Sequence, residues 1–183
     1  MVRHPAGSGR TRLSSVEPAP LIVTAELPEA LQSRADQLRQ AHFPPERNFL
    51  KAHVTLFHAL PSFAEGEVRD ALAQEARARP VAARLVDVMN LGRGTALRIT
   101  SPEMLSLRER LADRFHGLLT PQDQQAPRLH ITIQNKVSAS EARALQQTLA
   151  PRIAATDFAF RGFELHRYRG GPWEFVQRWR FRG

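Results

Sequence analysis

Two short β-rich stretches decide how this 183-residue chain folds: AHVTLF at residues 52–57 and LHITI at residues 129–133. Each carries a histidine followed two positions later by a threonine, so both contain the pattern His-x-Thr. A strand and a helix are predicted before each stretch, and a helix and a strand after it. This internal repeat predicts two similar αβ lobes, packed about a pseudo-twofold axis that brings the two histidine strands together across a central cleft.

The elements around the two stretches follow from hydrophobic periodicity and from capping signals. Residues 21–25 are expected to form a buried strand, and Pro28 opens a helix that Pro44 and Pro45 end. Residues 62–65 and 138–141 both match a capping box, with serine at the N-cap and glutamate three positions later. A helix is predicted from Ser101 and Pro102 through Leu118, and strands are predicted at residues 81–89, 95–100, 158–165 and 173–181.

Composition limits the class of protein. The chain has no cysteine, which excludes disulfides, thiolate metal sites and a cysteine nucleophile. No apolar run approaches the roughly 20 residues that span a bilayer, and the N-terminus lacks the apolar stretch of a signal peptide. We therefore expect a cytoplasmic protein without membrane contact. Residues 1–19 are expected to form a flexible basic arm, and residues 20–183 a single bilobal domain.

Positive charge gathers at the two ends of the chain. The formal net charge is +8, and arginines recur through residues 161–183 among the aromatic residues Tyr168, Trp173 and Trp179. Such charge attracts phosphate-bearing partners. A solubilising arginine-rich surface, or a strand that buries its aromatic side chains, explains the same pattern, so charge alone leaves both interpretations open.

Strand alternation groups the polar side chains of the two histidine strands, because residues two apart share a face. One face of the first strand holds Lys51, His53, Thr55 and Phe57, and one face of the second holds Arg128, His130, Thr132 and Gln134. The opposite faces are apolar and should pack inward under the helices. In a regular strand His58 would point away from the face of His53.

Two imidazoles, two hydroxyls and two cations suit a phosphate site. A neutral histidine can take a proton from an attacking hydroxyl or water, while a charged one protonates the leaving oxygen. Hydroxyls of Thr55 and Thr132 can donate to phosphate oxygens, and Lys51 and Arg128 can offset the charge there. Phe57 either stacks on a nucleobase or packs in the core. The scheme needs no metal and no cofactor.

The two motifs resemble the paired His-x-Thr-hydrophobic motifs of the 2H phosphoesterase superfamily, above all its bacterial 2′-5′ RNA ligase-like, cyclic phosphodiesterase-type members. The resemblance covers residues 20–181 and implies a monomeric α+β bilobal fold, with two antiparallel sheets lining a central cleft and helices outside. It implies metal-independent opening of 2′,3′-cyclic phosphates on RNA ends or nucleotides to 2′-phosphates, or the making and cleaving of 2′-5′ RNA linkages. It makes His53 and His130 the acid–base pair, and Thr55 and Thr132 the phosphate-binding hydroxyls.

The sequence departs from the family pattern at one point and leaves some questions open. Many family motifs have proline directly before the histidine, where this chain has Ala52 and Leu129. A non-catalytic RNA- or nucleotide-binding module on the same fold is the main alternative. A metal site formed by His53, His58 and His130 is a third, with no acidic residue nearby in the sequence to support it. Which histidine acts as the base is not decided by the sequence.

Overall fold

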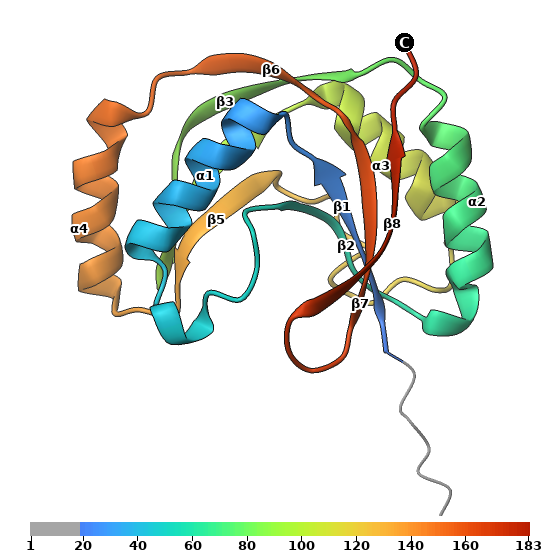
Figure 1. The fold of residues 1–183 in the computed structure, drawn as a ribbon, viewed down its shortest axis with the longest axis horizontal. Helices are drawn as coiled ribbons and strands as arrows, with labels where there is room; N and C mark the ends of the chain where they lie inside the picture. The colour runs from blue at the N-terminus through green and yellow to red at the C-terminus, as the bar shows by residue number, and fades with distance from the viewer. Residues whose placement is uncertain (1–18) are drawn as a thin grey trace, which may run out of the picture.

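A computed structural model describes residues 19–183, so all but the last residue of the predicted basic arm lies outside the described part. The described chain forms two four-stranded antiparallel sheets with helices on their outer sides (Figure 1). Sheet A has the order β2-β1-β7-β8 and contains β1 (Leu21–Glu26), β2 (Val54–Leu60), β7 (Gly162–Tyr168) and β8 (Trp173–Arg180). Sheet B has the order β5-β4-β3-β6 and contains β3 (Val81–Asn90), β4 (Gly94–Thr100), β5 (His130–Asn135) and β6 (Thr156–Phe160). This is the predicted bilobal α+β arrangement.

Four α-helices cover the outer sides of the two sheets. They are α1 (Glu29–His42), α2 (Glu65–Glu75), α3 (Pro102–Arg114) and α4 (Ala139–Leu149), with short 3-10 turns at Pro45–Arg47, Ser62–Ala64 and Ala150–Arg152. Helices α1 and α4 lie on the side of sheet B, and α2 and α3 on the side of sheet A (Figure 1). Within residues 19–183, no helix is long and apolar enough to cross a membrane.

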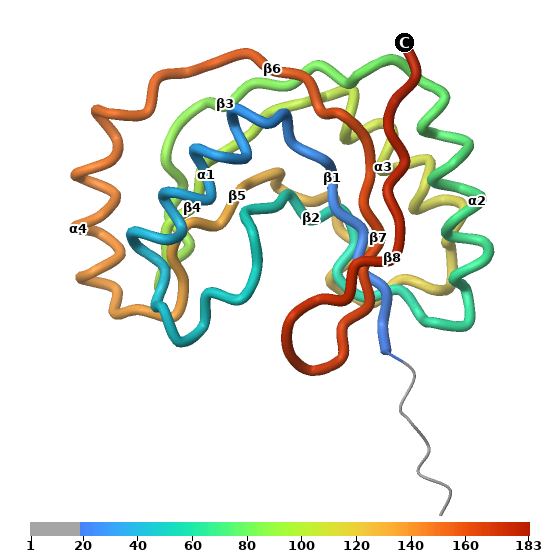
Figure 2. The backbone as a smooth tube through the Cα atoms, viewed as in Figure 1, coloured from blue at the N-terminus to red at the C-terminus, as the bar shows by residue number. Residues whose placement is uncertain are grey.

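The helix that precedes each histidine strand in the chain packs under the other histidine strand: α1 precedes β2 and packs against β5, and α3 precedes β5 and contacts β2. Helix α1 follows β1 of sheet A but packs against β5 of sheet B, and Figure 2 shows the path of the chain. Helix α3 follows β4 of sheet B, and just beyond it Phe115 packs edge-on against Phe57 of β2, with ring centroids 5.6 Å apart. The exchange ties both sheets into one hydrophobic core.

Capping is confirmed at two predicted helix starts and wrong at a third. Ser101 accepts a hydrogen bond from the backbone of Met104 at 3.1 Å, and Ser138 forms the full capping box with Glu141. Residues 62–64 instead form a 3-10 turn, and α2 begins at Glu65. The reason is that arginine side chains bind the Glu65 carboxylate, which therefore does not fold back onto the turn.

Two further elements differ from the sequence-based prediction. Helix α3 ends at Arg114 rather than Leu118, because the chain then turns through Gly117, which has a φ of 84°. The strand predicted at residues 158–165 is two strands, β6 in sheet B and β7 in sheet A, separated by Arg161. Arg161 and Gly162 interrupt the apolar run at the crossing, but such a local interruption does not reveal that the chain passes from one sheet to the other.

Candidate active site

A cavity of about 200 Å³ lies where the two histidine strands meet. It is lined by Ile22, His53, Thr55, His58, His130, Thr132 and Trp173. The histidine and threonine of each His-x-Thr motif therefore face one common space, as the pseudo-twofold repeat predicted. Their neighbours Val54 and Ile131 have no exposed surface, so the apolar faces of both strands pack inward.

The two paired histidines are held in the same tautomer. Nδ1 of His53 lies 2.8 Å from the carbonyl oxygen of Lys51, and Nδ1 of His130 lies 2.6 Å from the carbonyl oxygen of Arg128. A carbonyl oxygen only accepts, so each Nδ1 carries the hydrogen. Nε2 is then the ring nitrogen of each histidine that remains for chemistry in the cavity.

His53 is held in its neutral form. Burial is the main cause that lowers the pKa of His53 to about 4; the positive charges of Arg39, His166 and His130 lower it further, while the hydrogen bond to Lys51 opposes the shift. At neutral pH the imidazole of His53 therefore carries a free lone pair on Nε2, as a general base requires.

Each histidine strand contains a β-bulge directly after its threonine. In the pairing of β1 with β2, Thr24 lies opposite Thr55 and Val23 opposite Phe57, so Leu56 is the extra residue. In the pairing of β4 with β5 the register shifts in the same way: Ala96 lies opposite Thr132 and Thr95 opposite Gln134, so Ile133 is the extra residue. A bulge inserts one residue and reverses the alternation of side chains beyond it. The repeat thus extends to an irregularity that the sequence analysis did not predict.

The bulge corrects two of the sequence-based placements. Leu56 and Phe57 both turn into the core, and Phe57 has no exposed surface. Its expected position beside His53 on the cleft face is wrong, and of the two roles considered for it, core packing is the one observed. The same shift turns His58 onto the cavity, although a regular strand would point it away.

His58 is anchored by a buried carboxylate. Nδ1 of His58 lies 2.9 Å from Oδ1 of Asp123, which follows α3 in the chain and is only 1% exposed. Asp123 also accepts hydrogen bonds from the backbone N–H groups of His58 and Ala59 at 2.9–3.0 Å. Sequence reasoning missed this partner because Asp123 lies 65 residues further along the chain.

Buried arginines support both motif strands from behind. Arg39 on α1 donates to the carbonyl oxygen of Thr132 at 2.7 Å and to that of Leu50 at 3.2 Å. Arg108 on α3 donates to the carbonyl oxygen of Leu56 at 3.3 Å and also to that of Asp123. Each guanidinium therefore donates its hydrogen bonds to backbone carbonyl oxygens in or near a motif. Through these bonds α1 helps to position β5, and α3 helps to position β2.

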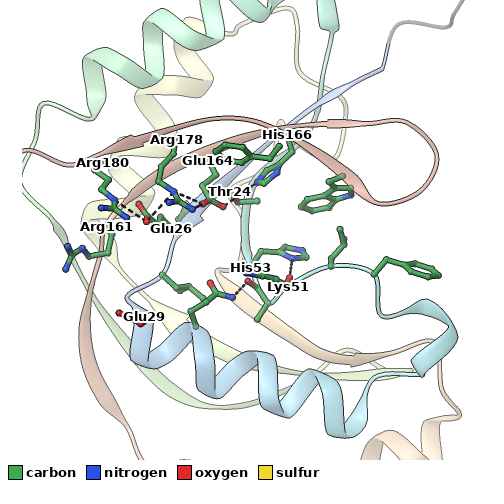
Figure 3. Close-up of a pocket in the computed structure, with 18 residues that line it drawn as sticks. Thr24, Glu26, Glu29, Lys51, His53, Arg161, Glu164, His166, Arg178 and Arg180 are labelled. Atoms are coloured by element: carbon green, nitrogen blue, oxygen red, sulfur yellow. Dashed lines mark hydrogen bonds and ion pairs between the residues drawn. The ribbon is translucent and has the colours of Figure 1, made fainter.

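A larger pocket of about 740 Å³ adjoins the cavity, and His53 and Trp173 line both. The Trp173 ring lies 4.6 Å from the ring of His53 and 5.5 Å from that of His166. Figure 3 shows a charged cluster to one side of this pocket, away from His53 and Lys51. The cluster consists of Glu26, Arg161, Glu164, Arg178 and Arg180.

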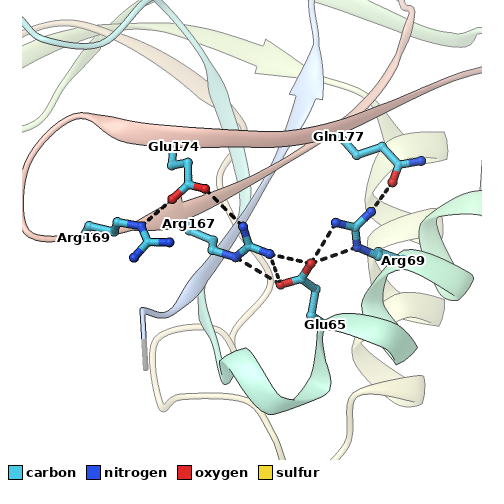
Figure 4. Close-up of polar contacts among 6 residues, drawn as sticks. All are labelled: Glu65, Arg69, Arg167, Arg169, Glu174 and Gln177. Atoms are coloured by element: carbon cyan, nitrogen blue, oxygen red, sulfur yellow. Dashed lines mark hydrogen bonds and ion pairs between the residues drawn. The ribbon is translucent and has the colours of Figure 1, made fainter. Parts of the chain in front are cut away.

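Salt bridges fix the β7–β8 hairpin that carries Trp173. Glu65 at the start of α2 accepts hydrogen bonds from Arg167 at 2.6 and 2.7 Å and from Arg69 at 2.9 Å (Figure 4). Arg167 also reaches Glu174 on β8 at 3.2 Å. Helix α2 is thereby linked to both strands of the hairpin. The hairpin also carries Trp173, whose ring lines the cavity between the two histidine strands.

The two cations predicted by strand parity lie just outside the strands, since β2 begins at Val54 and β5 at His130. Lys51 is exposed and lines the larger pocket. Arg128 is also exposed and lines neither of the two cavities that contain His53. Among residues 19–183, no group of three or more histidine, cysteine or acidic side chains is placed to hold a metal ion.

The family model for the 2′-5′ RNA ligase superfamily matches residues 27–172. The fold and the paired motifs already define a two-lobed protein with a histidine-lined cleft, and the chain belongs to this superfamily. A search of curated proteins gave no match.

Solved structures share the fold over nearly the whole chain. TT0787 of Thermus thermophilus is 19% identical with a TM-score of 0.60, covering 90% of this chain and 98% of its own. Escherichia coli LigT complexed with 3′-AMP is 22% identical with a TM-score of 0.58, covering 91% of this chain and 100% of its own. LigT complexed with NADP+ is 23% identical with a TM-score of 0.59, covering 90% of this chain and 99% of its own.

Sequence reasoning missed two kinds of residue at this site. Arg39 and Arg108 act through backbone oxygens far away in the chain, and a sequence pattern carries no signal for such contacts. His58 was detectable in principle: two consecutive apolar residues, Leu56 and Phe57, interrupt an otherwise alternating strand, and such an interruption is typical of a bulge.

Proposed function

We propose that this protein is a phosphoesterase that opens 2′,3′-cyclic phosphates on RNA ends or nucleotides to 2′-phosphates, through acid–base catalysis by His53 and His130. The observation that carries the proposal is the shared cavity, in which both histidines keep Nδ1 occupied by a backbone carbonyl and His53 is held neutral. Membership of the 2′-5′ RNA ligase superfamily supports the same reaction class.

The proposed reaction divides the proton transfers between the two imidazoles. Nε2 of neutral His53 takes a proton from water as the water oxygen bonds to phosphorus. The bond from phosphorus to the 3′ oxygen breaks, and His130 in its charged form gives that oxygen a proton. Thr55 and Thr132 donate to the non-bridging oxygens, which stabilises the charge that gathers there. Replacing water by a 5′-hydroxyl gives the corresponding 2′-5′ linkage.

The adjoining pocket supports a nucleotide or RNA end as the substrate. Two aromatic side chains that line it, Phe49 and Phe175, are 64% and 53% exposed. Exposed aromatic rings are platforms on which bases stack, and each stacked base adds about 1–3 kcal/mol to binding. Arg161 and Arg180 in the same pocket, together with Lys51, favour a phosphate backbone. Solved structures of LigT, which shares the fold, include complexes with 3′-AMP and with NADP+.

The test is turnover of a short RNA that ends in a 2′,3′-cyclic phosphate, in the presence of EDTA. Wild-type protein should yield the 2′-phosphate, identified by chromatography. His53→Ala and His130→Ala should each lower kcat by about 10²–10⁴-fold, the usual share of general acid–base catalysis. The acidic limb of the kcat/KM profile should fall near pH 4, because His53 must lose its proton to act as the base.

His116→Ala is the matched control, because His116 is exposed beyond α3 and lines neither cavity. Turnover that persists in both His53→Ala and His130→Ala would refute the assignment of the two histidines. Salt-sensitive RNA binding without any product would instead favour a binding module on the same fold. A cytoplasmic location and a monomeric state stay predictions from the sequence.

A further inference from the structure

The cavity contains a third imidazole that the two-histidine scheme does not use. His58 lines it together with His53, His130 and the two motif threonines. All the polar side chains of this lining are imidazoles, hydroxyls and the Trp173 indole; of the described residues, no acidic one lines it. The two hydroxyls and the indole N–H donate hydrogen bonds, as does any imidazole nitrogen that carries a hydrogen, so the lining suits an anion with several acceptor oxygens.

The contact with Asp123 determines how His58 faces this space. Burial acts to raise the pKa of Asp123, but hydrogen bonds from the His58 ring and from two backbone N–H groups outweigh it and keep the pKa below its usual value. The carboxylate is therefore ionised and can only accept, so Nδ1 of His58 carries the hydrogen. Nε2 of His58 is left for the cavity.

The backbone around His58 is also held. Asp123 accepts the N–H groups of His58 and Ala59, while Arg108 donates to the carbonyl oxygens of Leu56 and Asp123. These contacts fasten both sides of the bulge that turns His58 toward His53. The bulge and the buried carboxylate together place the ring, whereas Nδ1 of His53 and of His130 is held by a backbone carbonyl oxygen.

We infer that His58 is a third phosphate-binding group of this cavity, with Nε2–H donating to a non-bridging oxygen of the bound phosphoryl group. The inference rests on the proposed function, since it assigns a further contact within the same site. It adds a difference in role: His53 and His130 transfer protons, whereas His58 only holds the phosphoryl oxygen by a hydrogen bond. Asp123 is its positioning residue, because it touches His58 and does not line the cavity.

The experiment measures binding of inorganic phosphate by calorimetry, which does not depend on turnover. His58→Asn is the informative variant: its side-chain amide can still donate to Asp123 but does not reach the cavity. We expect its Kd for phosphate to rise about tenfold, the loss of one hydrogen bond to a charged group. His116→Asn, the same change outside the cavity, should bind phosphate like the wild type.

A second measurement keeps the inference testable if His58→Asn does not fold. In wild-type protein with ¹⁵N-labelled histidine, phosphate should move the Nε2 resonances of His53, His58 and His130. If those of His53 and His130 move while that of His58 does not, this inference is overturned and the proposed function stands. If none of the three moves, both are overturned. Wild-type phosphate affinity in a folded His58→Asn variant would also overturn the inference.

Discussion

Arg39 on α1 donates a hydrogen bond of 2.7 Å to the carbonyl oxygen of Thr132, a motif residue in the other half of the molecule. Its guanidinium also reaches the carbonyl oxygen of Leu50, shortly before His53. One buried side chain therefore binds backbone oxygens of both motif segments. Its guanidinium also lies over the ring of Phe43, 4.2 Å from the ring centroid, which helps to hold it in place. The geometry of the cavity therefore depends on the packing of α1, which follows β1 of sheet A, against β5 of sheet B.

Replacing this arginine should affect both stability and the charge state of His53. Arg39→Met leaves two backbone oxygens without their donor and should lower the free energy of unfolding by about 2–4 kcal/mol, measured by urea denaturation. Removing the positive charge should also raise the pKa of His53, which an NMR titration would follow. Arg34→Met is the control on the same helix: Arg34 makes one exposed hydrogen bond, and its loss should cost less than about 0.5 kcal/mol. Equal losses in the two variants would contradict the role of Arg39.

The depressed pKa of His53 should make the fold less stable in acid. In the unfolded chain a histidine titrates near pH 6.5, whereas His53 titrates near pH 4 in the folded protein. Between these values the unfolded chain binds a proton that the folded protein does not, so stability is lost as the pH falls from about 6.5 to 4. The loss amounts to at most about 3 kcal/mol. His53→Gln should remove this part of the pH dependence in urea denaturation and leave the slope above pH 6.5 unchanged. A variant that keeps the wild-type slope down to pH 4 would contradict the prediction.

The core position of Phe57 should appear in its energetics. Phe57→Ala opens a cavity against Phe115 and Arg108 and should lower the free energy of unfolding by about 3–5 kcal/mol. Phe63 provides the matched control, because it lies close in the sequence and is 82% exposed. Phe63→Ala should change stability by less than about 0.5 kcal/mol. Thermal unfolding of the two variants measures the difference. A change of less than about 1 kcal/mol for Phe57→Ala would contradict the buried position of Phe57.

Gly94 lets β4 approach the bulged end of β5. A Cβ atom at this position would lie 2.4 Å from the carbonyl oxygen of Gln134 and 2.9 Å from Cα of Asn135, so one strand would have to move. Gly94→Ala should therefore destabilise the fold by about 2 kcal/mol or more. It should also lower kcat by tenfold or more, because a displacement of about 1 Å at a site can cost 10²-fold in rate.

Gly66→Ala is the control for that substitution. A Cβ atom on Gly66 in α2 meets nothing within 4 Å. The change should stabilise the protein by about 0.5 kcal/mol through the unfolded state, with kcat unaltered. Equal stability of Gly94→Ala and wild type in urea denaturation would show that the contact between β4 and β5 is looser than observed.

Most of the fold was predictable because it depends on local patterns. The alternation in residues 52–57 and 129–133 predicted both histidine strands, and the serine at position 138 predicted the start of α4. The repeat predicted that both His-x-Thr pairs would face one cavity. The capping box at residues 62–65 failed for a tertiary reason, since Arg167, a residue of β7, competes for Glu65.

Strand periodicity and capping are set by neighbours in the chain, so local patterns were enough to identify the two motif segments and their equivalence. Long-range contacts were needed to place Phe57 in the core and His58 on the cavity. Both follow from a bulge, and Asp123 and Arg108 fasten that bulge from distant points in the chain. The neutral state of His53 was also decided by tertiary structure, because a pKa depends on burial and on charges brought together by folding.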